Sequence, residues 1–187
     1  MKSITDFIQA KSVVGVIDLP SVDQVLSTVQ LLANKNITTI ELTLRQRDVV
    51  IEATKQLAQN ANIVMGIGTI TNIADFDLAI SLGAEYIVSP GINENLINHW
   101  LKNYKHQVAY LPGVFTPSEI MTAVNYGIYH LKFFPSYQQI SHIKILQGPF
   151  ADVKFCATGG TSANTKDEFL ALDNVFAIGI SKNFEQL

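Results

Sequence analysis

Short runs of apolar and β-branched residues recur along the chain at intervals of about 22–26 residues. Such runs are typical of buried strands, and the interval leaves room for one strand, one helix and two short loops. The runs cover residues 13–17, 38–42, 63–66, 86–89, 107–111, 130–133, 153–156 and 175–178. The hydrophobic pattern therefore predicts eight strands separated by intervening segments.

The intervening segments mostly carry helical signals. Polar residues that can cap a helix N-terminus open four of them, at Ser21, Thr71, Thr116 and Ser162. Pro117 and Glu119 follow Thr116 with the spacing of a capping box that has proline at the first helical position. Gly83 and Gly127 stand where helix C-caps are expected. Helices therefore alternate with the predicted strands.

Eight alternating strand and helix units favour an α/β fold of the (β/α)8 barrel (TIM barrel) type. A doubly wound open sheet is the structural alternative, because the same alternation can build it. Only residues 181–187 follow the eighth predicted strand, so we expect the C-terminal eighth helix to be truncated or missing. A seam would then lie open between the first and seventh helices unless another element or subunit covers it. Residues 4–10 are predicted to form a short helix that closes the bottom of the barrel.

The composition narrows the class of protein. A chain of 187 residues, 48% hydrophobic and 16% charged, suits a single globular domain over residues 1–187. The net charge of −3 and the lack of a basic run argue against nucleic-acid binding. No apolar run is long enough for a membrane span, and the N-terminus does not resemble a signal peptide. A cytoplasmic protein is therefore expected.

Cysteine and histidine usage gives no sign of a disulfide or a metal site. Cys156 is the single cysteine, so an intrachain disulfide is impossible. The four histidines are scattered without the spacing of metal ligands. We expect Cys156 to be a small buried residue rather than a nucleophile, because no basic partner is evident in the sequence.

Lys132 is the most informative residue of the chain. It lies near the end of the sixth predicted strand, among aromatic residues, and Pro135 marks the end of that strand. An amine removed from water is more often neutral, and a neutral amine can attack a ketone to form a Schiff base. The alternative is a lysine whose stem is packed while its ammonium reaches solvent.

Further polar residues stand at other predicted strand ends, where barrel enzymes carry their active sites. Glu41, Thr43 and Arg45 share one side of the second strand and offer an acid/base and an anion clamp. A structural ion pair is the alternative for this segment. Glycines beside Thr69 at the end of the third strand would let a ligand approach the backbone, although a simple turn is equally compatible with them.

Gly159 and Gly160 follow the seventh strand, and Ser181 follows the eighth. Paired glycines between a strand and a helix suit backbone N–H groups gathered around an anion, and barrel phosphate sites commonly lie after these two strands. A tight turn is the alternative. All these residues stand at predicted strand ends, which meet at one end of a barrel. Together they predict a site with a lysine, a carboxylate, an arginine and a loop that can bind an anion.

Over nearly its whole length the chain resembles the 2-keto-3-deoxy-6-phosphogluconate (KDPG) aldolase / 4-hydroxy-2-oxoglutarate aldolase family. The segments that carry the resemblance are specific when taken together and in this order: 41–45, 66–69, 89–91, 112–113, 131–135, 148–150 and 155–160. The related phosphogalactonate aldolases resemble the chain less, because they replace the arginine of the second strand.

The resemblance implies a class I aldolase without a metal or other cofactor. In that family pattern Lys132 matches the Schiff-base lysine and Glu41 the general acid/base. The remaining matches are binding positions: Arg45, Thr69 and Thr158 for the pyruvate carboxylate, Pro90 and Phe134 for the pocket wall, and Gly159, Gly160 and Ser181 for the substrate phosphate. The resemblance also implies a homotrimer and a role in carbohydrate metabolism, in the Entner–Doudoroff pathway.

The chain departs from the family pattern in three places. Ala157 replaces the proline that commonly precedes Thr-Gly-Gly, Ile180 replaces the middle glycine of Gly-Gly-Ser, and the C-terminal helix is missing. We expect the bulk of Ile180 to lie beside the phosphate position.

The predicted reaction is cleavage of a 2-keto-4-hydroxy acid through a Schiff base on Lys132. KDPG would give pyruvate and glyceraldehyde 3-phosphate, and 4-hydroxy-2-oxoglutarate would give pyruvate and glyoxylate. Two alternatives stay open at this point. One is a phosphate-binding isomerase or decarboxylase of the same fold that forms no imine, and the other is a non-catalytic relative that binds pyruvate or forms oligomers.

Overall fold

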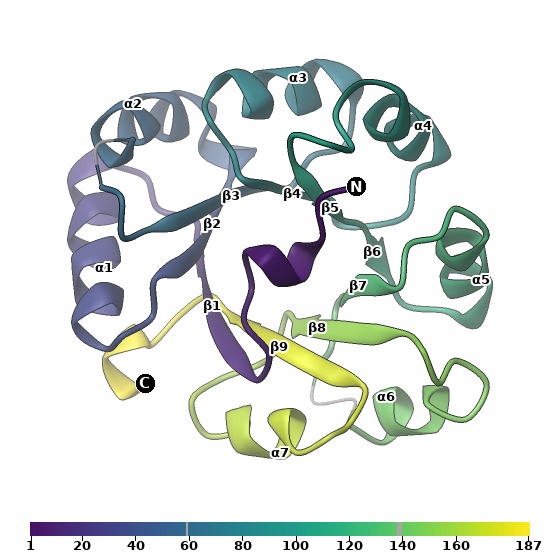
Figure 1. Ribbon diagram of the computed structural model, residues 1–187. Coiled ribbons are helices and arrows are strands. Elements are labelled where there is room, and N and C mark those ends of the chain that lie inside the picture. Colours follow the sequence, from purple (N-terminus) through teal and green to yellow (C-terminus); the bar gives the residue numbers. More distant parts are fainter. Residues whose placement is uncertain (59, 138–139) are drawn as a thin grey trace.

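The computed structural model describes residues 1–58, 60–137 and 140–187. Within these residues nine strands lie parallel in one sheet. Their bounds are β1 Ser12–Ile17, β2 Thr39–Thr43, β3 Val64–Gly68, β4 Tyr86–Val88, β5 Ala109–Leu111, β6 Gly113–Val114, β7 His130–Phe133, β8 Lys154–Thr158 and β9 Val175–Ile180. The sheet curls into the ring seen in Figure 1.

The ring closes through Pro112. The strand order runs β5-β4-β3-β2-β1-β9-β8-β7-β6, so β5 and β6 form the two edges of the sheet. Pro112 joins these two edges, and its carbonyl accepts the backbone N–H of Lys132 from β7 at 2.9 Å. Proline cannot donate to a ladder, so Pro112 separates β5, which matches the fifth predicted strand, from β6, which lies beyond that prediction. The barrel prediction is confirmed, and the open-sheet alternative is wrong.

Seven α-helices surround the ring in the described part of the chain (Figure 1). They are α1 Val22–Asn34, α2 Arg47–Leu57, α3 Ile73–Ser81, α4 Glu94–Asn103, α5 Pro117–Asn125, α6 Ile140–Leu146 and α7 Lys166–Leu170. Among the described residues, none of the helices has the length and apolar character required to cross a membrane.

Most of the predicted caps are present. Ser21 caps α1 by accepting the backbone N–H of Gln24, and Thr116 and Glu119 complete the capping box of α5. Asn72 caps α3, within the segment 71–75 that was expected to open this helix. The start predicted at Ser162 is wrong, because α7 begins only at Lys166. The hydroxyl of Thr165 accepts the backbone N–H of Ser162 at 3.0 Å, and this turn delays the helix.

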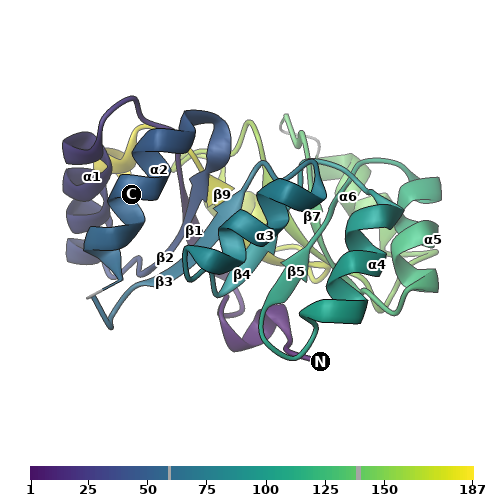
Figure 2. The ribbon, with the colours of Figure 1, turned by 90° about the horizontal axis from the view of Figure 1, so that it is seen from above.

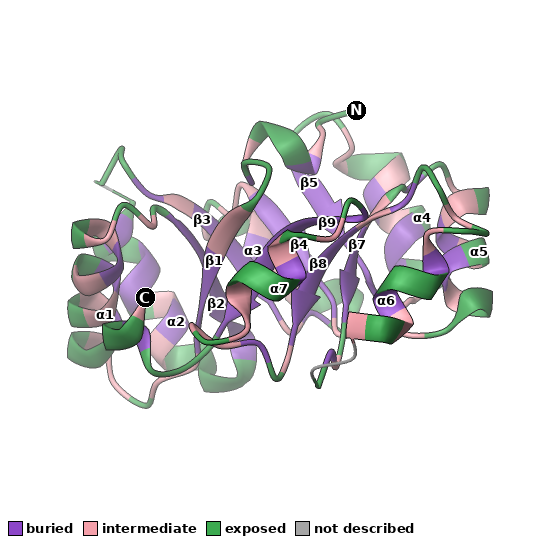
Figure 3. Ribbon diagram, turned by 90° about the horizontal axis from the view of Figure 1, so that it is seen from below, coloured by how far each residue is buried: buried purple, intermediate pink, exposed green. Residues whose placement is uncertain are grey.

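Apolar side chains form two cores on the two faces of the sheet. The larger core lies between the strands and the helices, and the smaller one fills the inside of the barrel. Because both faces are covered, the strands are buried almost throughout (Figure 3). Tyr86 belongs to the inner core, where it is fully buried and its hydroxyl donates to the carbonyl of Ile40 at 2.6 Å. Burial and the nearby Glu41 raise the pKa of Tyr86 well above its ordinary value.

A short 3-10 helix, η1 (Ile4–Asp6), covers the end of the barrel where the strands begin, as Figures 1 and 2 show. Ile4 and Ile8 are buried in the inner core. The hydroxyl of Thr39, in the first position of β2, donates to the carbonyl of Phe7 at 3.4 Å. The predicted closure of the barrel bottom is thus confirmed, by a helix shorter than residues 4–10. The opposite end, where the strands finish, remains accessible to a ligand.

After β9, the last described residues form a second 3-10 helix, η3 (Phe184–Gln186), which lies beside α1. Phe184 is buried in the larger core. The amine of Lys35, just after α1, donates to the carbonyls of Glu185 and Leu187 at 2.9 and 2.7 Å. These contacts cover the α1 side of the seam.

Candidate active site

Lys132 and Glu41 form a buried ion pair inside the barrel mouth. The amine of Lys132 donates to Oε1 and Oε2 of Glu41 at 3.0 and 3.3 Å. The two side chains are only 8% and 4% exposed. The prediction that Lys132 is not a freely solvated lysine is therefore confirmed, because the amine itself is removed from solvent. Its neighbours Leu131 and Phe133 point to the larger core, so strand alternation directs Lys132 into the barrel.

Two glycines of β3 make room for the side chains around this pair. A Cβ atom on Gly68 would overlap the carboxylate of Glu41, and one on Gly66 would overlap the ring of Tyr86. Both glycines lie inside the strand rather than in a turn. The sequence-based interpretation of these glycines as a turn or a ligand approach is therefore incomplete, because their lack of a side chain positions Glu41 and seats Tyr86 beneath the site.

The pair lines a cavity of about 210 Å³ at the C-terminal ends of the strands. Its lining residues are Val16, Glu41, Thr43, Arg45, Thr69, Pro90, Lys132, Phe134, Thr158, Gly159 and Ser181. Every predicted site residue except Gly160 lines this one cavity. Another cavity of similar volume, at the opposite end beside η1, contains none of them. The mouth of the barrel, where catalysis occurs in this fold, is therefore the candidate site.

Three residues that line the cavity carry groups suited to a carboxylate. Arg45 reaches the mouth from η2 (Leu44–Gln46), directly after β2. Thr69 follows β3 with φ 65°, a left-handed conformation that is an outlier for a β-branched residue. Thr158 ends β8, and a side chain on Gly179 of β9 would collide with its hydroxyl. The cavity thus combines a guanidinium with two hydroxyls, a set that can bind a carboxylate bidentately and by added hydrogen bonds.

Phe134 and Pro90 add apolar surface to the same cavity. The amine of Lys132 lies 5.4 Å from the centroid of the Phe134 ring, within range of a cation–π contact. Pro90 follows β4, and its backbone packs so closely on Gly113 that a Cβ there would collide with it. The cavity that holds the amine is therefore bounded by apolar as well as polar groups.

The glycine loop after β8 lies at the rim. Gly159 and Gly160 have φ values of 80° and 98°, a region that favours glycine. Gly159 lines the cavity, whereas Gly160 packs its Cα against the backbone of Tyr137. Ser181 lines the cavity from the end of β9. The expected position of Ile180 is wrong. Its side chain is fully buried in the larger core and does not line the cavity.

The sequence analysis missed Asp18 and Val16. Val16 lines the cavity from β1, and Asp18 follows the same strand. One oxygen of Asp18 accepts the hydroxyl of Thr43 at 2.9 Å, and the other lies 2.7 Å from Nη2 of Arg45. The available signal was a carboxylate directly after the first predicted strand, because barrel active sites lie at the C-terminal ends of the strands.

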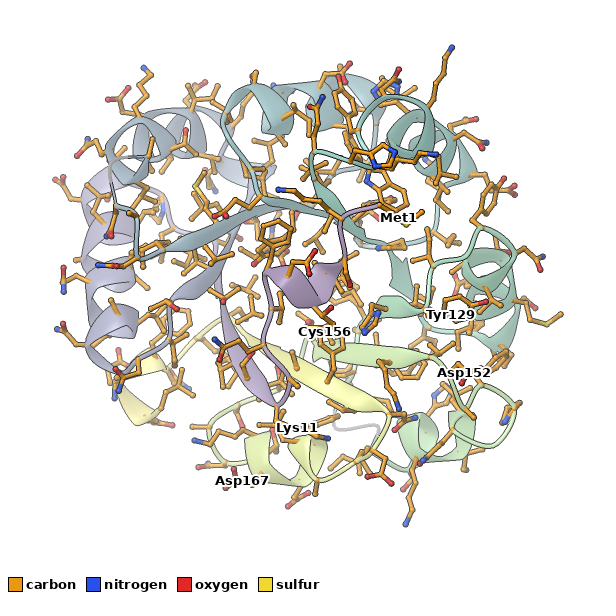
Figure 4. The ribbon with its side chains drawn as sticks, in the orientation of Figure 1. Met1, Lys11, Tyr129, Asp152, Cys156 and Asp167 are labelled. Carbon is orange, nitrogen blue, oxygen red and sulfur yellow. The ribbon has the colours of Figure 1, made fainter. Side chains whose placement is uncertain are left out.

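Cys156 lies in the inner core beneath the site, near the centre of the ring in Figure 4. Burial raises the pKa of its thiol to about 12, so the thiol is protonated at neutral pH. The prediction of a buried, non-nucleophilic cysteine is confirmed. Within residues 1–58, 60–137 and 140–187, no group of three or more histidine, cysteine or acidic side chains is arranged to hold a metal ion.

A family model described as KDPG and KHG aldolase matches residues 4–186. The chain belongs to this family. A 2-dehydro-3-deoxy-phosphogluconate aldolase of Pseudomonas aeruginosa is 32% identical over 171 residues, which cover 89% of this chain and 76% of the relative. The predicted family and enzyme class are thereby confirmed, since its named relatives are aldolases, which are carbon–carbon lyases.

Solved structures of the family share the fold. The 2-keto-3-deoxy-6-phosphogluconate aldolase of Zymomonas mobilis superposes with a TM-score of 0.88 at 26% identity, over 96% of this chain and 86% of the other. A KDPG aldolase from Legionella pneumophila, with pyruvate captured as a covalent carbinolamine intermediate, gives a TM-score of 0.80 at 27% identity, over 92% and 83% of the two chains.

Proposed function

We propose that the chain is a single-domain class I aldolase in which Lys132 forms a Schiff base with the ketone of a 2-keto-4-hydroxy acid. The observation that carries this proposal is the buried amine of Lys132, 3.0 Å from Glu41 in the cavity at the barrel mouth. The covalent pyruvate adduct in the Legionella pneumophila relative supports the same chemistry for this site.

The ion pair supplies the proton transfers. Glu41 takes a proton from the Lys132 ammonium, and the neutral amine then attacks C2 of the ketone to form a carbinolamine. Protonated Glu41 returns its proton to the departing hydroxyl, so water leaves and an iminium remains. The carboxylate of Glu41 is thereby regenerated and can accept the proton of the C4 hydroxyl as the C3–C4 bond breaks. An aldehyde departs, and the enamine left on Lys132 is protonated at C3 and hydrolysed to pyruvate.

The polar residues that line the cavity orient the substrate. Arg45, Thr69 and Thr158 bind the carboxylate next to the ketone, which directs C2 toward the amine of Lys132. Phe134 and Pro90 shape the pocket and limit water near the iminium. No metal or other cofactor is needed, because the iminium itself withdraws electrons from the bond that breaks.

The leaving aldehyde defines the substrate. With KDPG the products are pyruvate and glyceraldehyde 3-phosphate, and with 4-hydroxy-2-oxoglutarate they are pyruvate and glyoxylate. Backbone groups of Gly159 and Gly160, together with Ser181, are the proposed phosphate contacts. Comparing kcat/KM for the two substrates tests this part, because a phosphate site in use should give KDPG the advantage.

Reduction with borohydride in the presence of pyruvate tests the covalent step. We expect a stable adduct that maps to Lys132 by mass spectrometry, and none in Lys132→Arg. Lys154→Arg is the matched control, because Lys154 lies on the adjacent strand β8 and its amine contacts the carbonyl of Asp173. An adduct on another lysine, or none at all, would contradict the proposed mechanism.

The same assays separate the two rival functions. Turnover of a phosphorylated sugar without a trappable adduct would favour an isomerase or decarboxylase of this fold. An adduct without cleavage of any 2-keto-4-hydroxy acid would favour a non-catalytic pyruvate-binding relative. A cytoplasmic homotrimer working in the Entner–Doudoroff pathway is part of the proposal and rests on the family resemblance.

A further inference from the structure

Asp18 is placed at the edge of the cavity by the register of the first two strands. Ile17 pairs with Leu42, so Asp18 follows opposite Thr43 at the end of β2. Val16, two positions earlier, lines the cavity, and the side chain of Thr43 does so from the neighbouring strand. Strand alternation therefore directs Asp18 to the same side as these residues, and its hydrogen bond with Thr43 agrees with that direction.

The two oxygens of Asp18 have separate partners. Oδ1 accepts the hydroxyl of Thr43 at 2.9 Å, and Oδ2 lies 2.7 Å from Nη2 of Arg45. Thr43 is 3% exposed and belongs to the sheet, so it provides a fixed support for the carboxylate. Asp18 therefore connects the guanidinium of Arg45 to the fixed position of Thr43 in β2.

Arg45 needs such a support. Its side chain is 61% exposed, and a long exposed side chain loses rotamer freedom when it binds a ligand. The bond to Asp18 engages Nη2, while the guanidinium has five N–H donors and can still present a fork to a carboxylate. Water screens this exposed ion pair, so the pair adds little to the stability of the protein. The contact with Asp18 nevertheless limits the positions that the Arg45 side chain can adopt.

We propose that Asp18 is a positioning residue that holds Arg45 ready for the carboxylate of the keto acid. The inference rests on the proposed function and deepens it, since it assigns the orientation of the carboxylate clamp to the residue that follows β1. Asp18 itself touches neither the ketone nor the bond that breaks.

Pyruvate affinity in Asp18→Asn tests the role. The amide retains the shape and can accept from Thr43, but it offers no charge to Arg45. We expect the dissociation constant for pyruvate, measured by calorimetry, to rise about fivefold. The borohydride adduct at saturating pyruvate should reach the level of the unaltered chain. Adduct formation with methyl pyruvate, which lacks the carboxylate, should keep its concentration dependence.

Asp75→Asn is the matched control. Asp75 pairs with Arg47, two residues after Arg45, and neither residue of that pair lines the cavity. Its removal should leave pyruvate affinity unchanged.

The outcomes distinguish the two proposals. Unchanged pyruvate affinity in Asp18→Asn would overturn the positioning role, whether or not an adduct forms. Tighter pyruvate binding would also overturn it and show that Asp18 competes with the substrate. Equal weakening with methyl pyruvate would indicate general damage and refute the role. Pyruvate binding without any adduct in the unaltered chain would instead contradict the Schiff-base mechanism alone.

Discussion

The amine of Lys132 lies 3.0 Å from a carboxylate oxygen of Glu41, although 91 positions separate the two residues in the sequence. Lys132 comes from β7 and Glu41 from β2, and both side chains are less than a tenth exposed. Each charge has been removed from water and depends on the other for compensation. The pair is therefore both the proposed catalytic centre and a point where stability and function are coupled.

Because the two charges compensate each other, we expect removal of one charge to destabilise the protein more than removal of both. Lys132→Met leaves the carboxylate of Glu41 buried without its partner, which should lower the free energy of unfolding by about 3–5 kcal/mol. Adding Glu41→Gln removes the unpaired charge, so the double variant should be more stable than Lys132→Met alone. Urea unfolding at pH 7 measures the difference. A double variant less stable than Lys132→Met would show that the pair is not compensated as described.

Gly68→Ala should reduce activity through Glu41. The added methyl group would overlap the carboxylate of Glu41 and push it from the amine of Lys132. We expect kcat for aldol cleavage to fall about 100-fold, because displacing a reacting group by about 1 Å has an effect of this size. Gly148→Ala is the control, since a Cβ there meets its nearest neighbour at an ordinary 3.6 Å. Equal activity in the two variants would mean that Gly68 does not position Glu41.

Substitutions of Thr69 should affect protein stability and pyruvate affinity differently. Its φ of 65° strains a β-branched residue, and glycine adopts this conformation without strain. Thr69→Gly should therefore be more stable than Thr69→Ala by about 1 kcal/mol in urea unfolding. Both variants lose the hydroxyl, so both should weaken pyruvate binding about tenfold. If the glycine variant binds pyruvate as tightly as the unaltered chain, the hydroxyl of Thr69 does not contact the carboxylate.

The sequence predicted the barrel and the placement of Lys132, Glu41 and Arg45 because both depend on local pattern. Alternating strands and helices define the barrel, and the fold rule then directs polar residues at strand ends to one mouth. The contact of Arg45 with Asp18 could not be predicted in this way. It depends on the register between β1 and β2 and on side-chain rotamers, which a single sequence does not determine.

Glycine and proline positions were harder to interpret. Gly68 looked like part of a turn, because its effect depends on Glu41 from the neighbouring strand. Pro112 lies just beyond the fifth predicted strand, and the pattern gave no sign that its carbonyl accepts a ladder hydrogen bond from Lys132 and closes the ring. The expected position of Ile180 was wrong because the family motif shows only that a bulky residue replaces glycine. It does not show that the side chain lies on the face of β9 that packs against the larger core.

Cys156 gives the protein a defined dependence of stability on pH. Burial raises the pKa of its thiol to about 12, whereas a thiol in an unfolded chain titrates near about 8.5. Below about pH 8.5 the thiol is protonated in both states and contributes nothing to the pH dependence. Between about pH 8.5 and 12 the unfolded chain releases the proton while the folded chain keeps it, so stability falls as pH rises.

Comparing the unaltered chain with Cys156→Ala at pH 7.5 and pH 10 isolates this effect. Between these two pH values the unaltered chain should lose about 2 kcal/mol more of its unfolding free energy than the variant does. The cavity left by alanine lowers stability equally at both pH values, so it does not affect the change between them. The buried hydroxyls of Tyr86 and Tyr110 are present in both proteins, so their contribution cancels when the two proteins are compared. An identical pH dependence in the two proteins would mean that the thiol ionises in the folded state, which would require water to reach the inner core beneath Lys132.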